Sequence, residues 1–221
     1  ARGLATWIVA KIEHPVALDH LDEILDSCNA VMVARGDLGV EIPLEEVPIA
    51  QQRIIDGALE RGMPVIVATQ MLETMTVNPR PTRAEVSDIS TAIRQGATGV
   101  MLSGETASGK YPLKSVKTKA KIAKSTEQGL ESSNLKPESV NKYRSTRAVA
   151  HAGVELAKMA NASRILVATE RGNAPRLVSL HQPGIPVTAV TNTIETARKV
   201  QILPGVDLSL IHISEPTRPS I

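Results

Sequence analysis

The stretch Val31-Met32-Val33-Ala34-Arg35-Gly36-Asp37 decides the fold, because an apolar run ends there abruptly in a polar cluster. The same change recurs within residues 7–13, 65–70 and 99–105, and the clusters lie roughly 30 residues apart. A strand that is buried on both faces reads as a short, continuous apolar run, and a strand with its crossover helix needs roughly 30 residues. The sequence therefore predicts consecutive βα units that form a parallel sheet.

Helical periodicity fills the segments between these runs. Apolar residues recur every third or fourth position within residues 17–27, 48–60 and 82–95, and again after Pro112. Thr82 stands three residues before Glu85, which is the spacing of a helix-capping box. Strands that alternate with helices indicate an α/β fold, and four such units make half of a (β/α)8 barrel. We therefore expect the chain to be a fragment of a closed barrel.

The composition changes at Gly129, where a polar segment without periodicity begins. A second α/β module follows, with helices predicted over 146–160, 174–181 and 195–200 and strands over 165–168 and 187–190. The pattern ends at Val206, and we interpret Ser209–Ile221 as non-native sequence that resembles nothing in the module. The predicted division is a half-barrel over 1–128, a linker over 129–143, a partial C-terminal α/β domain over 144–206 and an atypical tail over 207–221.

The bulk composition excludes several classes of partner. The net charge of the 221 residues is only +2, and aromatic residues make up 1% of the chain, so neither a strong basic field nor stacking platforms favour nucleic acid. No apolar run is long enough to cross a bilayer. The only cysteine is Cys28, which excludes an intrachain disulfide. We expect a soluble, cytoplasmic protein without nucleic-acid or membrane partners.

Two carboxylates follow neighbouring predicted strands. Glu13 and Asp37 come at the carboxyl ends of these strands, where parallel α/β folds bind ligands. Two oxygen ligands completed by substrate and water suit Mg²⁺, so we predict a shared metal site. The alternative is that both acids only cap helices. Lys11 lies two residues before Glu13 and would neutralise a metal-bound phosphate, or form a plain ion pair.

Glycine and hydroxyl residues complete the predicted edge. Gly36 lets the backbone approach an anion, although a simple tight turn is the alternative. Thr69 follows the third strand, and Ser103 and Glu105 follow the fourth. We expect all three side chains to point into the same site at the carboxyl ends of the strands. A hydroxyl there can relay a proton, or it can merely cap the next helix.

At this point a resemblance to the pyruvate kinase family becomes close. It rests on five ordered motifs over residues 8 to about 128, and residues 144–206 resemble the start of that family's C-terminal domain. The motifs are Lys11-Ile12-Glu13, Met32-Val33-Ala34-Arg35-Gly36-Asp37-Leu38-Gly39-Val40-Glu41-Ile42-Pro43, Ala68-Thr69-Gln70-Met71-Leu72-Glu73, Asn78-Pro79-Arg80-Pro81-Thr82-Arg83-Ala84-Glu85 and Val100-Met101-Leu102-Ser103-Gly104-Glu105-Thr106-Ala107.

The resemblance implies the last four strands of a (β/α)8 barrel and a glycolytic phosphotransferase. Phosphoenolpyruvate and ADP would give pyruvate and ATP, with Mg²⁺ (or Mn²⁺) and with K⁺, whose ligands would belong to the missing half. The full-length protein would be a homotetramer. The implied metal ligands are Glu13 and Asp37. The implied catalytic residues are Lys11, Thr69, Ser103 and Glu105, and the implied substrate contacts are Lys11, Ala34, Gly36, Asp37 and Thr69.

Two alternatives stay open. A metal-dependent pyruvate aldolase on a similar barrel also pairs a Glu with an Asp at strand ends, although the Thr69-Gln70 and Ser103-Gly104-Glu105-Thr106 elements favour the kinase. A partial chain that only oligomerises is the non-catalytic alternative. Because half of the barrel and its lid are missing, we expect residues 1–221 alone not to turn over phosphoenolpyruvate.

Overall fold

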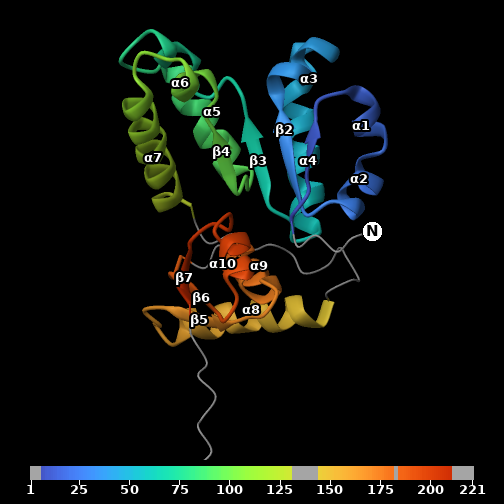
Figure 1. The fold of residues 1–221 in the computed structure, drawn as a ribbon, viewed down its shortest axis with the longest axis vertical. Coiled ribbons are helices and arrows are strands. Elements are labelled where there is room, and N and C mark those ends of the chain that lie inside the picture. Colours follow the sequence, from blue (N-terminus) through green and yellow to red (C-terminus); the bar gives the residue numbers. More distant parts are fainter. Residues whose placement is uncertain (1–5, 131–143, 182–183, 211–221) are drawn as a thin grey trace, which may run out of the picture. The chain divides into compact units, whose positions relative to one another are not determined.

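Four parallel strands form one sheet in the order β1-β2-β3-β4 (Figure 1). The computed structural model describes residues 6–130, 144–181 and 184–210. The strands are β1 (Val9–Ile12), β2 (Ala30–Ala34), β3 (Val65–Ala68) and β4 (Gly99–Met101). Their order in space follows their order in the chain, as expected for consecutive strands of a (β/α)8 barrel. The predicted parallel α/β architecture is confirmed.

The register places the polar clusters at one edge of this sheet. Lys11 is opposite Met32, and Ala34 is opposite Ala68, which in turn is opposite Met101. The residues that follow Ala34, Ala68 and Met101 therefore leave the sheet at the same edge, where the strands end.

Helices connect the strands of this first unit. They are α1 (Pro15–Asp19), α2 (Leu21–Ser27), α3 (Arg35–Glu41), α4 (Val47–Glu60), α5 (Arg83–Arg94), α6 (Gly104–Ala107) and α7 (Pro112–Gln128), with 3-10 turns η1 (Leu44–Glu46) and η2 (Glu73–Thr76). The predicted capping box is confirmed, since the Thr82 hydroxyl accepts the N–H of Glu85 and the Glu85 carboxylate accepts the N–H of Thr82. Gly96 follows α5 with a left-handed φ of +101°, which glycine adopts at low cost.

Two local predictions were incomplete. The single helix expected over 17–27 is broken at His20, which ends α1 and precedes α2. No helix was predicted over Arg35–Glu41, where the alternative was a tight turn at Gly36, but this segment is helix α3. Its two glycines hid the helical pattern, because glycine normally weakens a helix.

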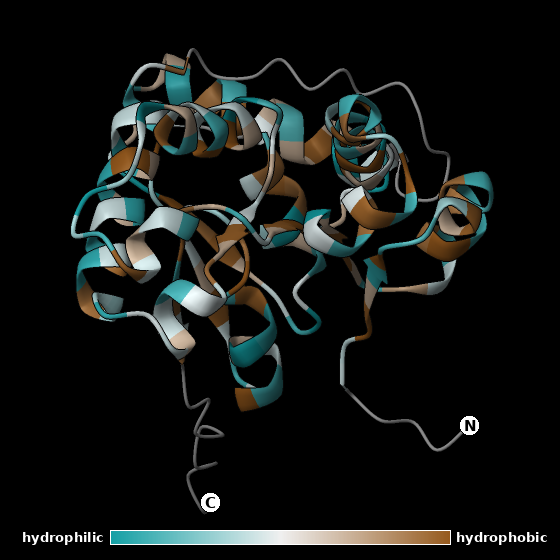
Figure 2. Ribbon diagram, turned by 90° about the horizontal axis from the view of Figure 1, so that it is seen from above, coloured by the Kyte–Doolittle hydropathy of each residue, from teal (hydrophilic) through white to brown (hydrophobic). Residues whose placement is uncertain are grey.

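A continuous apolar core lies between the sheet and the helices. Val31, Val33, Val65 and Val67 are fully buried, and Ile54 of α4 packs in the same cluster. Figure 2 shows hydrophobic and hydrophilic residues on different sides of the helices. This segregation explains why the period of about 3.6 residues was readable in the sequence.

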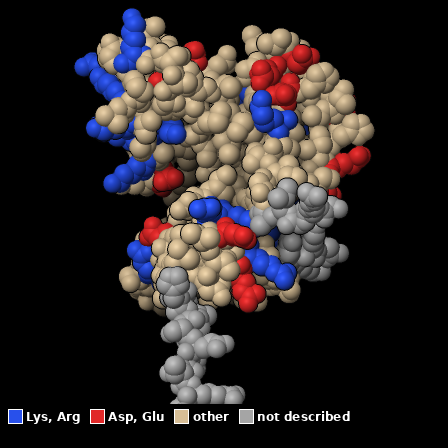
Figure 3. Space-filling model, viewed as in Figure 1, with Lys and Arg blue, Asp and Glu red and all other residues tan. Residues whose placement is uncertain are grey.

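The outer face of α7 is basic. Its exposed lysines form one stripe, visible as blue side chains along this helix in Figure 3; they are Lys114, Lys117, Lys121 and Lys124. The opposite side of α7 carries the buried residues Ser115 and Thr126. The stripe is thus the solvent face of an amphipathic helix.

A second compact unit contains a three-stranded parallel sheet in the order β5-β6-β7. Its elements are α8 (Arg144–Met159), β5 (Ile165–Ala168), α9 (Asn173–Leu180), β6 (Val187–Thr191), α10 (Ile194–Val200) and β7 (Val206–Leu210). The first five elements agree with the predicted ones within a few residues.

Strand β7 corrects the prediction that the pattern ends at Val206. Residues Val206 to Leu210 pair in parallel with Val187 to Thr191 of β6. A five-residue edge strand of mixed polarity has too few residues to show a clear period, which is why the sequence did not reveal it. Residues 211–221 of the predicted tail, and most of the predicted linker, lie outside the described residues.

In the described ranges no helix has both the length and the hydrophobicity that crossing a bilayer requires.

Candidate active site

Lys11 joins the two predicted metal carboxylates. Its Nζ lies 2.7 Å from Oε2 of Glu13 and 3.9 Å from Oδ2 of Asp37, so the first two strand ends bring all three side chains together. Hydrogen bonding and attraction to Glu13 raise the pKa of Lys11, and the same pair lowers the pKa of Glu13. The lysine is therefore a full cation and Glu13 a full anion at neutral pH.

The donor set at this edge fits a hard divalent cation. Both carboxylates approach one positively charged nitrogen, so their negative charges gather at one place. No group of three or more His, Cys, Asp or Glu residues among the described residues is placed to hold a metal ion. A cation at Glu13 and Asp37 would take its remaining ligands from substrate and water, which is how Mg²⁺ commonly binds.

Thr69 and Gln70 form a left-handed turn directly after β3. Their φ angles are +68° and +55°, which L-residues other than glycine seldom adopt. The Thr69 hydroxyl donates to the carbonyl of Ala68 at 2.6 Å and accepts the N–H of Gly36 at 2.7 Å. Gly36 and Thr69 are thus joined across two neighbouring strand ends.

Arg35 supports this turn and is a site residue that sequence reasoning missed. Its guanidinium donates to the carbonyls of Thr69 and Gln70 at 2.7 and 3.3 Å and to Asp88 at 2.7 Å. The residue is only 8% exposed. The available signal was a charged residue placed directly after the buried residues of β2.

Glu105 does not point into the mouth of the site, contrary to the prediction. It is fully buried, and its two carboxylate oxygens accept the N–H groups of Leu72 and Ser103 at 2.9 and 2.7 Å. Burial is tolerated because both oxygens are hydrogen-bonded. Glu105 thus ties the segment after β3 to the segment after β4.

The structure therefore arranges the predicted residues in three groups. Ion pairs join Lys11, Glu13 and Asp37, a hydroxyl joins Gly36 to Thr69, and a buried carboxylate joins Glu105 to Ser103. Ala34 ends β2 and precedes α3, beside the second group.

These features define a parallel α/β protein whose charged side chains gather at the carboxyl edge of the sheet, where such folds bind ligands. A family model described as "Pyruvate kinase, barrel domain" matches residues 1–116, and one described as "Pyruvate kinase, alpha/beta domain" matches residues 147–219. The second match extends past Val206 to residue 219, so its range includes β7 and part of the predicted tail. The chain belongs to the pyruvate kinase family.

Individual relatives agree with this assignment. The chain is 43% identical over 211 residues to pyruvate kinase 2 of Synechocystis sp., covering 96% of this chain and 35% of the relative. It is 43% identical over 210 residues to a pyruvate kinase of Geobacillus stearothermophilus, covering 92% and 35%. A crystal structure of a pyruvate kinase from Cryptosporidium parvum superposes with a TM-score of 0.87 at 37% identity and covers 93% of this chain and 42% of that one. The chain thus spans about a third of the length of these curated relatives.

Proposed function

We propose that this chain contains metal-binding and substrate-binding residues of a pyruvate kinase, at the carboxyl edge of its first sheet. A pyruvate kinase converts phosphoenolpyruvate and ADP to pyruvate and ATP in glycolysis. The observation that carries the proposal is the shared contact of Lys11 with Glu13 and Asp37 at adjacent strand ends. Phosphoryl transfer needs charge neutralisation and alignment rather than a covalent nucleophile, and this edge offers both.

Each residue of the edge has a proposed role. Glu13 and Asp37 would hold Mg²⁺ or Mn²⁺, which when bound neutralises charge on the phosphoryl oxygens. Lys11 would contact the transferring phosphoryl group and the enolate oxygen that it leaves. The backbone of Ala34, Gly36 and Asp37 would hold the substrate.

The proton step is assigned to the route through Ser103, because the Thr69 hydroxyl donates its hydrogen to the Ala68 carbonyl. Transfer of the phosphoryl group from the enol oxygen to ADP leaves an enolate, whose methylene carbon must take up one proton to give pyruvate. Thr69 would contact the substrate near this enolate, and Ser103 would belong to the proton route. Because both oxygens of Glu105 are used by backbone amides, we propose that Glu105 holds Ser103 in place and does not touch the substrate.

The proposal extends to the protein as a whole. We propose a cytoplasmic homotetramer that also needs K⁺, whose ligands would lie outside this chain, and we derive no step through K⁺. The domain division proposed from the sequence, 1–128, 129–143 and 144–206, is kept, except that β7 moves the start of the tail from 207 to 211.

The experiment compares two proteins. The first is the 221-residue chain, which should form no ATP above background from phosphoenolpyruvate, ADP, Mg²⁺ and K⁺. The second is a chimera in which residues 8–128 replace the matching segment of the Geobacillus stearothermophilus relative. The chimera should form ATP, and changing Lys11→Met in it should abolish turnover. A correctly folded chimera without activity would contradict the proposed function. Release of pyruvate and an aldehyde from a 4-hydroxy-2-oxo acid, by cleavage of its C–C bond, would support the aldolase instead.

A further inference from the structure

The Thr69-Gln70 turn holds two consecutive non-glycine residues in the left-handed region. Such residues each cost on the order of 1–2 kcal/mol, so the surroundings must hold them in place. Among the described residues of this chain, Thr69, Gln70 and Asn161 are the non-glycine residues with positive φ. Two of the three thus lie together at the proposed substrate contact.

A single side chain from another strand end holds the turn. Nη2 of Arg35 donates to the backbone carbonyls of both left-handed residues, Thr69 and Gln70. These carbonyls would point elsewhere if the two residues relaxed to ordinary φ angles. The planar guanidinium donates several hydrogen bonds in a fixed arrangement, which a lysine ammonium cannot reproduce.

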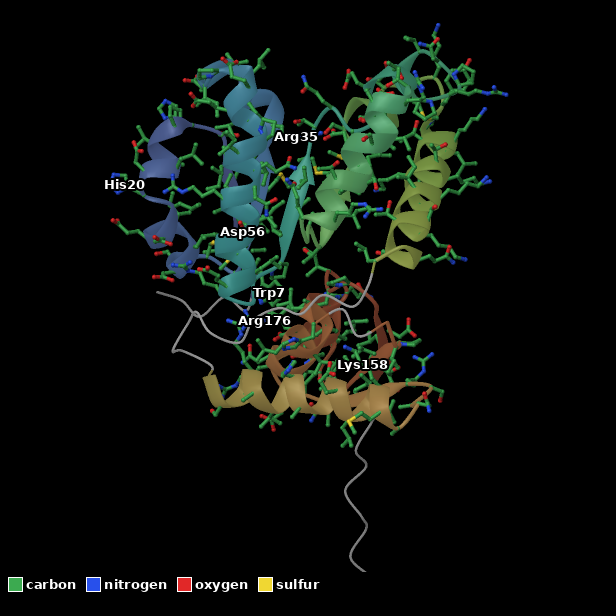
Figure 4. The ribbon with its side chains drawn as sticks, turned by 180° about the vertical axis from the view of Figure 1, so that it is seen from behind. Trp7, His20, Arg35, Asp56, Lys158 and Arg176 are labelled. Carbon is green, nitrogen blue, oxygen red and sulfur yellow. The ribbon has the colours of Figure 1, made fainter. Side chains whose placement is uncertain are left out.

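Asp88 fixes the guanidinium in turn. Nη1 of Arg35 donates to Oδ1 of Asp88, which lies on α5, at 2.7 Å. The Arg35 side chain is 9% exposed, so this ion pair is screened less than a surface pair. Figure 4 shows Arg35 at the same end of the sheet as the candidate site, between the helix that carries it and α5.

We propose that Arg35, held by Asp88, is a positioning residue that clamps the left-handed Thr69-Gln70 turn and so fixes the place of Thr69 at the proposed substrate contact. The inference rests on the proposed function for the substrate contact of Thr69, but the clamp itself does not. It also gives Asp88 of α5 a role in the geometry of the site. Arg35 touches neither substrate nor metal in this role.

The first arm of the test measures amide hydrogen exchange in the 221-residue chain. Arg35→Lys keeps the positive charge but loses the planar set of hydrogen-bond donors. Asp88→Asn removes only the negative charge of the side chain that holds Arg35. The N–H of Gly36 donates to the Thr69 hydroxyl of the turn, so its exchange should accelerate at least about tenfold in Arg35→Lys and less in Asp88→Asn, while the strands keep their protection. The control is Arg61→Lys, because Arg61 also donates to two carboxylates, Asp22 and Asp26, and is 15% exposed.

The second arm measures kinetics in the chimera described above. A displacement of about 1 Å can cost roughly 100-fold in rate, so Arg35→Lys should lower kcat/KM for phosphoenolpyruvate about 10- to 100-fold. The KM for ADP should stay within about twofold, because the clamp acts on the other substrate. A general loss of stability would lower the amount of active enzyme without separating the two substrates.

Defined results would overturn the clamp. They are unchanged exchange of the Gly36 N–H in both variants, or kinetics of Arg35→Lys equal to those of Arg61→Lys. If Arg35→Lys unfolds, Asp88→Asn decides, and unchanged exchange and kinetics in that variant reject the proposal. An inactive unsubstituted chimera would reject the proposed function instead, and the exchange arm would still decide the clamp.

Discussion

The carboxylate of Glu105 accepts the backbone N–H of Leu72 at 2.9 Å across 33 residues of sequence. Its other oxygen accepts the N–H of Ser103 at 2.7 Å. One buried side chain therefore links the segments that follow β3 and β4, and with them the two hydroxyl residues of the proposed site.

Replacement of Glu105 should destabilise the first unit. Glu105→Gln places an NH2 group against one of two N–H donors, which leaves a buried donor unsatisfied at a cost of about 1–3 kcal/mol. Urea unfolding of the 221-residue chain measures the change. Glu73→Gln is the control, because Glu73 is exposed in the neighbouring turn and should change the free energy of unfolding by less than about 0.5 kcal/mol. Equal effects of the two variants would contradict the tethering role.

Loss of either metal carboxylate should weaken cation binding. Asp37→Asn and Glu13→Gln each remove one of two anionic ligands, and we expect the affinity for Mn²⁺ to fall at least about tenfold. Titration of the 221-residue chain with Mn²⁺, followed by electron paramagnetic resonance, measures the affinity directly and needs no enzymatic activity. Asp26→Asn is the control, because Asp26 pairs with Arg61 elsewhere. Unchanged binding in Asp37→Asn would exclude Asp37 as a ligand.

A comparison of glycine with alanine at position 70 tests the backbone strain of the turn. Gln70 is exposed with φ of +55°, so glycine there should be more stable than alanine by about 0.5–1 kcal/mol, even though glycine loses more chain entropy on folding. Thermal or urea unfolding of Gln70→Gly and Gln70→Ala tests this. If alanine proves as stable as glycine, the turn does not keep its left-handed geometry in solution.

His181 should make the second unit sensitive to acid. Burial, which is the largest cause, acts together with the nearby His151, Arg147 and Lys158 to lower the pKa of His181 from 6.5 to about 4, while Glu155 opposes them. The unfolded chain therefore binds more protons between pH 6.5 and 4. The stabilisation is complete above pH 6.5 and is lost as the pH falls through this window, by about 1–3 kcal/mol.

Two measurements test the role of His181. Urea unfolding at pH 7.5 and pH 5, followed by amide exchange in α9, should show the loss in the wild type and a smaller loss in His181→Gln. His20→Gln, at an exposed histidine, should behave like the wild type. An NMR titration of the His181 ring with a midpoint near 6.5 would show that the ring is not buried in solution.

Local signals in the sequence were sufficient to predict most of the helices and strands. Buried strands appear as apolar runs, and Thr82, Glu85 and Gly96 mark helix ends, because these effects act within a few residues of the chain. The same signals were insufficient for α3, whose glycines oppose the helix, and for β7, whose formation depends on the neighbouring strand β6.

The sequence by itself also determined which chemistry the site can carry. It placed Lys11, Glu13, Asp37 and Thr69 at consecutive strand ends, because parallel βα units bring these ends to one edge. Only the tertiary structure decided how Arg35 and Glu105 act. Three of their partners, Thr69, Asp88 and Leu72, lie more than 30 positions away. A pairing over such distances follows from the packing of neighbouring strand ends rather than from any local pattern.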